Sequence, residues 1–219
     1  MGLSYQKNID QNTSFAVWKI EETEQELYAQ LQLDEREKAY FETLQHNKRS
    51  IHWLSTRVLL RKMLQTDEYI DCQVDEHGKP YLVNFPHHIS LSHSYDYAAV
   101  MISEKKLVGI DIELIKPKIE RLADKFLSPQ EMAFIHPAQA VNHLYVCWCA
   151  KEAIYKLQGR GNVSFKEHIH LQPFSYRDAG QLHAELKLEN KHWPLEVHFE
   201  KFGDYMLGYV SSEEDVHAK

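Results

Sequence analysis

The segment from Gln139 to Gln158 constrains the fold of this chain more than any other, because its residue pattern predicts one long helix that Gly159 ends. At about 100° per residue, five positions of this helix fall within about 80° of one another. Four of them are apolar or aromatic: Val141, Tyr145, Trp148 and Tyr155. The fifth is Glu152, so an acidic side chain lies inside an apolar stripe.

Short runs of alternating apolar and polar residues dominate the chain on both sides of this helix and predict antiparallel strands. After the helix they lie around His168–Phe174, Leu182–Leu188, Leu195–Phe199 and Tyr205–Val210. The first half contains a strand pattern at Ser14–Ile20 and a helix pattern at Lys48–Gln65. We therefore expect an α+β fold of two similar subdomains, residues 1–103 and 104–219, each a small antiparallel sheet packed with helices.

Local signals mark several boundaries along the chain. Thr23, Asp34 and Ser128 are each followed three residues later by glutamate, which predicts a helix start with a capping box. That capping role is our preferred explanation of Glu131. Further strands are expected at Tyr81–Val83, Ile89–Ser92, Tyr97–Ile102 and Leu107–Glu113, the last two forming a hairpin through residues 103–106.

Composition excludes some classes of function. The formal charge of −7 argues against a protein whose main partner is nucleic acid. No apolar stretch reaches the roughly 18 residues of a membrane span, and Met1–Asn12 lacks the apolar centre of a secretory signal. The three cysteines have no disulfide spacing, and the fourteen histidines form no zinc motif. We expect a cytoplasmic protein without a membrane or nucleic-acid partner.

The strand pattern Val108–Glu113 places two acidic residues on one face. Period-2 alternation directs Val108, Ile110 and Ile112 to one side, and Gly109, Asp111 and Glu113 to the other. The two acids are then close enough to share one cation, and Gly109 leaves their face open. On these six residues alone, an ordinary solvated strand face is the favoured alternative.

Glu152 shifts the balance toward a metal site. A buried carboxylate needs a partner, and a surface pair with Lys156 does not explain its place in the apolar stripe. Three carboxylates without a histidine or thiol suit Mg²⁺, which also takes phosphate oxygens. The expected substrate is therefore a phosphate ester or anhydride. Basic groups that could bind it are Lys48, Arg49, Lys79, His93, Lys151 and Lys156.

Two motifs at this spacing resemble the 4′-phosphopantetheinyl transferase superfamily, especially its larger, pseudo-dimeric Sfp-like members. The first is Val108-Gly109-Ile110-Asp111. The second is the segment Trp148–Lys156, whose Glu152 follows Asp111 by 41 residues. Gly78-Lys79-Pro80 and Ser90–Ser94 resemble further family segments, although Ser90 replaces the usual asparagine.

The resemblance implies a 4′-phosphopantetheinyl transferase fold and a role for each candidate residue. Asp111, Glu113 and Glu152 would hold Mg²⁺, and Glu152 and Lys156 would act in catalysis. The coenzyme A contacts implied are Lys48, Arg49, Arg57, Lys79, Ser92, His93, Lys151 and Lys156. Residues 1–103 would supply the nucleotide contacts, and residues 104–219 the carboxylates and the signature helix.

The implied activity is that of a holo-carrier-protein synthase. It would transfer the phosphopantetheine arm of coenzyme A to a serine of an apo acyl or peptidyl carrier protein, releasing 3′,5′-ADP. A pseudo-dimeric chain of this type is expected to act as a monomer. A Mg²⁺-dependent phosphodiesterase or nuclease, and a non-catalytic nucleotide- or carrier-binding module, remain the alternatives.

Overall fold

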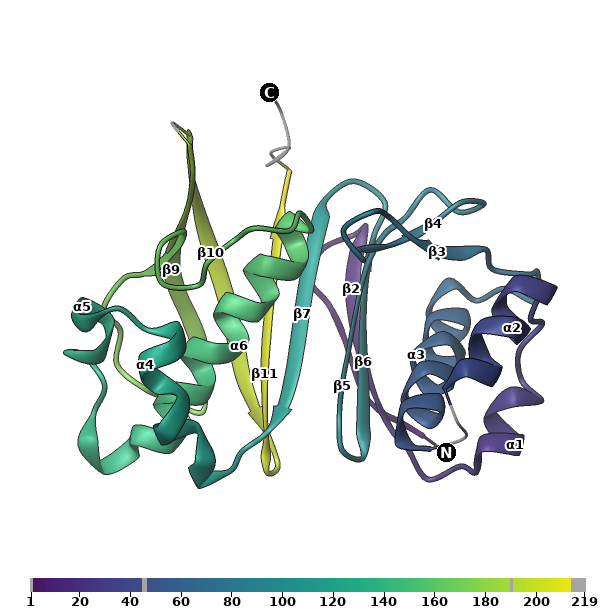
Figure 1. Cartoon of the computed structure of the whole chain (residues 1–219), viewed down its shortest axis with the longest axis horizontal. Coiled ribbons are helices and arrows are strands. Elements are labelled where there is room, and N and C mark those ends of the chain that lie inside the picture. The colour runs from purple at the N-terminus through teal and green to yellow at the C-terminus, as the bar shows by residue number, and fades with distance from the viewer. Residues whose placement is uncertain (1, 45–46, 190, 214–219) are drawn as a thin grey trace.

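The fold has four layers, with two β-sheets packed face to face and helices covering the outer face of each (Figure 1). The structure is a computed structural model and describes residues 2–44, 47–189 and 191–213. Both sheets are antiparallel, which confirms the α+β class. Within these ranges, no helix is both long and apolar enough to cross a lipid bilayer.

The first sheet and its helices are built from residues 3–103. Its strands, in spatial order, are β1 (Leu3–Asn8), β2 (Thr13–Lys19), β6 (Tyr97–Ser103) and β5 (His88–Ser94). The helices are α1 (Glu24–Tyr28), α2 (Glu35–Thr43) and α3 (Lys48–Leu64), and a small hairpin joins β3 (Cys72–Val74) to β4 (Pro80–Leu82). Thr23 and Asp34 form the predicted capping boxes, and Gln65 ends α3 in the left-handed conformation.

The second sheet contains residues 107–212. Its strands, in spatial order, are β7 (Leu107–Leu114), β11 (Tyr205–Ser212), β10 (Lys191–Phe202), β9 (Ala179–Leu188) and β8 (Ile169–Leu171). The long helix α6 (Ala140–Gln158) covers it, as predicted, and Gly159 ends that helix at φ 68°. Its buried face differs from the predicted stripe, of which Tyr145 is buried whereas Val141, Trp148, Glu152 and Tyr155 are half-buried. Shorter turns of helix precede α6: η1 (Pro117–Leu122), α4 (Ala123–Phe126), α5 (Pro129–Met132) and η2 (Pro137–Gln139).

Three apolar cores hold the layers together. One lies between α3 and the first sheet, and another between α6 and the second sheet. The third lies between the two sheets and takes residues from both, including Phe15 and Met101 from the first and Ile110 and Leu207 from the second. The two halves of the chain therefore share a buried interface.

The predicted hairpin between Tyr97–Ile102 and Leu107–Glu113 is wrong. Strand β6 pairs with β2 and β5, whereas β7 pairs with β11 in the other sheet. Residues 104–106 cross from one sheet to the next, and Lys106 is anchored to Asp10 at 2.9 Å. The true hairpin joins β5 to β6. The predicted boundary between residues 103 and 104 falls in the crossing segment, and the division into subdomains stays a prediction.

Candidate active site

Three acidic side chains from two elements approach one another where α6 crosses β7. On β7, Val108, Ile110 and Ile112 enter the core between the sheets, so Asp111 and Glu113 face α6, as the alternation predicted. Glu152 projects from α6, and its pKa responds to both acids of β7. The structure therefore brings all three predicted carboxylates into one cluster.

Glycine makes this close approach of helix and strand possible. A Cβ added at Gly109 would lie 1.9 Å from the carbonyl oxygen of Ala153, and one at Gly208 would lie 2.9 Å from backbone atoms of Cys149. The face beside Gly109, expected to be open, is instead covered by α6. Gly208 was missed, although a glycine inside a strand pattern is a recognised sign of close backbone contact.

Buried Asp111 is the centre of this cluster. One of its carboxylate oxygens, Oδ1, accepts hydrogen bonds from Lys156 Nζ at 2.7 Å and from Ser92 Oγ at 2.9 Å. The other, Oδ2, is buried and has no hydrogen-bond partner among the described residues. An orphaned carboxylate oxygen of this kind is costly unless a cation or a donor reaches it.

The other two acids resist ionisation. Burial, followed by the charge of Asp111, raises the pKa of Glu113, and Ser94 Oγ donates to this carboxylate at 2.8 Å. Burial, together with Asp111 and Glu113, raises the pKa of Glu152 to about 7, while Lys156 acts in the opposite direction. A carboxylate with a pKa near 7 can exchange a proton at neutral pH.

The donor set fits a hard divalent cation. Three carboxylates with mutual repulsion and one unpaired buried oxygen are stabilised by a positive ion that prefers oxygen ligands. In the part of the chain that the structure describes, however, no three His, Cys, Asp or Glu side chains converge closely enough to hold a metal. Lys156 is instead the cation paired with Asp111. The magnesium assignment therefore stays a prediction.

A groove of about 710 Å³ runs along the first half of the molecule beside this cluster. Its lining includes two predicted arginines, Arg49 and Arg57, the glycine and proline of the Gly78–Pro80 turn, and His93. The guanidinium of Arg57 lies 3.6 Å from the ring centre of Trp53, which also lines the groove. Such a groove, with aromatic and cationic walls, suits a planar anionic ligand.

His93 connects the groove to the acids. Its ring stacks on His52 with 4.3 Å between centroids, and its neighbours along β5, Ser92 and Ser94, bond to the two acids of β7. Desolvation by the surrounding protein, followed by the charges of His52 and Lys156, lowers the pKa of His93 to about 4. In the unliganded protein, the imidazole of His93 is therefore neutral at pH 7.

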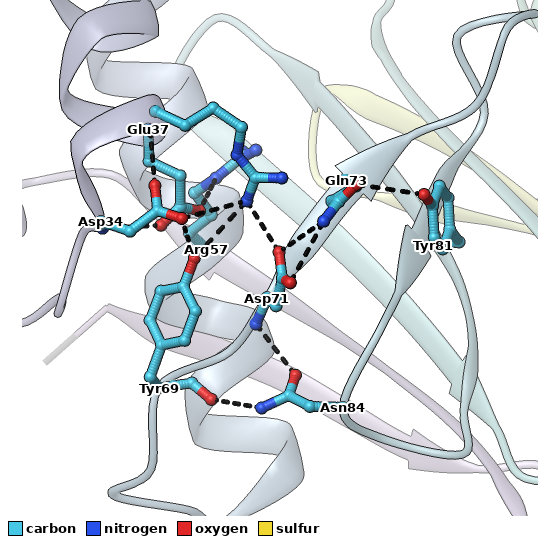
Figure 2. A network of polar contacts seen from close by, with 9 residues as sticks. Asp34, Glu37, Arg57, Tyr69, Asp71, Gln73, Tyr81 and Asn84 are labelled. Atoms are coloured by element: carbon cyan, nitrogen blue, oxygen red, sulfur yellow. Dashed lines mark hydrogen bonds and ion pairs between the residues drawn. The ribbon is translucent and has the colours of Figure 1, made fainter.

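A polar network fixes the outer wall of the groove (Figure 2). Tyr69 donates to Asp34 at 2.9 Å, and Arg36 pairs with Asp71 at 2.7 Å, which ties the start of α2 to the segment before β3. Arg57 lies at the edge of this network, with its Nε 4.0 Å from Glu37. No local pattern predicts these contacts, because they join residues 35 positions apart.

Two predicted lysines, Lys48 and Lys79, do not line the groove. The ammonium of Lys48 lies 5.7 Å from the ring centre of Tyr95. Lys79 donates to the carbonyl oxygen of Leu157 at 2.6 Å, which satisfies the end of α6. Its backbone neighbours Gly78 and Pro80 line the groove, whereas the lysine itself borders an adjacent cavity.

The structure contradicts the assignment of Lys151 as a coenzyme A contact. Its side chain is fully buried, pairs with Glu131 and donates to the carbonyl oxygens of Phe165 and Ile169. An ammonium group has three protons, and all three are used. Glu131 also forms the predicted capping box and accepts from Leu171 N. Lys151 and Glu131 thus form a structural pair under α6.

The hydroxyl group of Ser92 also forms its hydrogen bonds within the protein. Its hydroxyl donates to Asp111 and accepts from Lys156 Nζ and from the backbone N–H of Ile112. One donor and two acceptor positions are all that a hydroxyl offers, so these three contacts use its hydrogen-bonding capacity in this structure. Its assignment as a coenzyme A contact stays a prediction.

Comparisons with known proteins agree with the motifs. A sequence model described as the 4′-phosphopantetheinyl transferase superfamily matches residues 107–210. The chain is 31% identical over 147 residues to a 4′-phosphopantetheinyl transferase of Bacillus subtilis, a match that covers 65% of this chain and 63% of the relative. It is 36% identical over 113 residues to the 4′-phosphopantetheinyl transferase AcpT of Escherichia coli, covering 49% of this chain and 57% of that protein. The matches thus span less than two thirds of these relatives. Over residues 107–210, which hold both motifs, the chain thus matches the 4′-phosphopantetheinyl transferase superfamily.

Proposed function

We propose that this chain transfers 4′-phosphopantetheine from coenzyme A to a serine of an apo acyl or peptidyl carrier protein. The observation that supports this most is the cluster of Asp111, Glu113 and Glu152 beside Lys156, next to a groove with cationic and aromatic walls. The match to this family supplies the class of reaction. The cluster supplies groups suited to a pyrophosphate: acids for a divalent cation, and an ammonium for the phosphate oxygens.

Each residue has a defined task in this reaction. Asp111, Glu113 and Glu152 would hold Mg²⁺, which when bound neutralises charge on the pyrophosphate. Lys156 stabilises the negative charge that develops on the bridging phosphate. The carrier serine Oγ attacks the β-phosphorus, the bond from that phosphorus to the bridging oxygen breaks, and 3′,5′-ADP departs. Glu152 accepts the serine proton, directly or through a water molecule.

The nucleotide end of coenzyme A occupies the groove in this proposal. Arg49, Arg57 and His93 line it and supply positive or hydrogen-bonding groups, and Trp53 offers a flat apolar surface. Residues 1–103 then provide the nucleotide contacts, and residues 104–219 the carboxylates. We further propose that the protein acts in the cytoplasm as a monomer.

A mass measurement tests the proposal directly. The purified chain, Mg²⁺, coenzyme A and an apo carrier protein are incubated, and the carrier is expected to gain about 340 Da, the mass of the covalently attached arm. Glu152→Gln should slow the transfer by about 10²- to 10⁴-fold, as expected for loss of a general base. Asp124→Asn, which changes an exposed carboxylate away from the cluster, is the matched control.

The same incubation separates the alternatives. A phosphodiesterase would release 3′,5′-ADP from coenzyme A when the carrier is left out, and a binding module would release none under any condition. Absence of a mass gain on fatty-acid, polyketide and peptide carriers alike would refute the transferase proposal.

A further inference from the structure

Strands β5 and β7 are the facing edges of two different sheets, and serine side chains join them. The hydroxyl oxygens of Ser90, Ser92 and Ser94 accept the backbone N–H groups of Ile110, Ile112 and Leu114 at 3.0, 3.2 and 3.2 Å, respectively. We call this arrangement the serine ladder. Its register advances by two residues on both strands, so β5 and β7 run parallel.

Serine suits this position for a steric and a chemical reason. All three serines are buried, and period-2 alternation directs them to the same face of β5. Their side chains are short enough to let two strand edges approach, and each offers an acceptor where a sheet would present a carbonyl oxygen. An alanine would leave the facing N–H group buried without a partner.

Two members of the ladder have a second contact. Ser92 Oγ donates its proton to Asp111 Oδ1 at 2.9 Å, and Ser94 Oγ donates to Glu113 Oε2 at 2.8 Å. Each of these hydroxyls therefore fixes a backbone N–H and a carboxylate at once. Ser90 accepts from Ile110, and no bond from it to either acid is found among the described residues.

We infer that Ser92 and Ser94 are positioning residues that orient Asp111 and Glu113 for the divalent cation, whereas Ser90 only joins the two sheets. This inference rests on the proposed function, because it concerns the same three carboxylates. Hydrogen bonds to ligating carboxylates orient them, and their loss typically lowers metal affinity by about 10- to 100-fold.

Matched variants separate the two roles. Ser90→Ala, Ser92→Ala and Ser94→Ala each remove one acceptor of the ladder, but only the last two also remove a donor to a carboxylate. Mn²⁺ is titrated into each protein in the presence of coenzyme A, and the free ion is followed by electron paramagnetic resonance, with coenzyme A alone as the blank. Ser92→Ala and Ser94→Ala should weaken Mn²⁺ binding by about 10- to 100-fold, and Ser90→Ala should leave it unchanged.

Amide hydrogen exchange tests the ladder without any metal. In the wild-type protein the amides of Ile110, Ile112 and Leu114 should be protected, and each alanine variant should speed exchange at its own partner first. Unchanged exchange in all three variants would refute the ladder. Equal Mn²⁺ affinity in Ser90→Ala and Ser92→Ala would refute the positioning role while leaving the metal site intact. If the wild-type protein binds no Mn²⁺, the magnesium assignment fails, and the positioning role fails with it.

Discussion

Glu152 occupies a position where burial and two neighbouring acids oppose its ionisation. Its pKa is raised from 4.5 to about 7, so the folded protein holds a proton that the unfolded chain has released across this interval. The free energy of unfolding therefore falls as the pH rises from 4.5 to about 7, because the folded state binds more protons in this range than the unfolded state. The positive charge of Lys156 acts against this rise in the pKa of Glu152.

The first prediction concerns this proton. Without divalent cations, the wild-type protein should lose about 1–3 kcal/mol of unfolding free energy relative to Glu152→Gln between about pH 5 and about pH 8. Urea unfolding of both proteins at several pH values measures it. The comparison is with the variant because His93, with its lowered pKa, changes stability in the opposite direction in acid. Parallel pH profiles for the two proteins would contradict the raised pKa.

Lys151 leads to a second prediction. Removing one member of a buried ion pair leaves the other uncompensated, so Lys151→Met should destabilise the fold by about 3–5 kcal/mol. Thermal unfolding measures the loss, and Lys125→Met, at an exposed position, is the control. The KM for coenzyme A, measured below the melting temperature, should not change. A raised KM in a protein of unchanged stability would restore Lys151 as a substrate contact.

Periodicity was sufficient to identify the acids but not to separate the two lysines of the signature helix. Alternation on β7 and the 3.6-residue repeat of α6 are local properties, so Asp111, Glu113 and Glu152 could be chosen before the structure was known. Whether Lys151 or Lys156 faces the acids depends on which other segments of the protein pack over each lysine. Phe165 and Ile169, which enclose Lys151, lie in a loop and a short strand whose placement no local pattern determines.

At the scale of elements, the contact between α6 and β7 determines how close Glu152 comes to Asp111. Gly109→Ala would place a methyl group against the Ala153 carbonyl, and backbone atoms cannot move aside as a side chain can. We expect a loss of about 1–3 kcal/mol or more in unfolding free energy, measured by thermal unfolding, and a larger relative loss of transferase activity. A displaced helix would move Glu152 away from the β7 acids.

Gly161→Ala is the matched control for this change. Its added methyl group would meet nothing closer than 3.9 Å, and the residue follows the same helix. Equal effects of the two substitutions would contradict the close-packing explanation for Gly109.

Helix starts were predictable to the residue, whereas strand partners were not. The capping boxes at Thr23, Asp34 and Ser128 depend on side chains three positions apart, and all three form as expected. Pairing of β7 with β11 joins residues almost 100 positions apart, and alternation alone does not reveal which strand lies beside which. The short loop at residues 104–106 favoured a hairpin, but the shared apolar core between the sheets requires a crossing.

At the scale of the molecule, this shared core should make the two halves unfold together. Phe15 of the first sheet packs against Tyr209 of the second, with ring centroids 4.6 Å apart. We predict a single calorimetric transition whose van't Hoff and calorimetric enthalpies agree. Phe15→Ala should cost about 3–5 kcal/mol and lower the midpoint of that transition without splitting it. Two separate peaks would show that each half is stable alone.

The serine ladder also changes how the molecule meets other proteins. A strand at the border of a sheet presents unpaired backbone groups that can recruit a strand from another chain, which is a common route to aggregation. The two sheets have four such borders, at β1, β5, β7 and β8. Because β5 and β7 cover each other, neither of these two edge strands is exposed for pairing with a strand of another molecule. The contact that orients the acids thus also protects the protein from self-association at the place where its two halves meet.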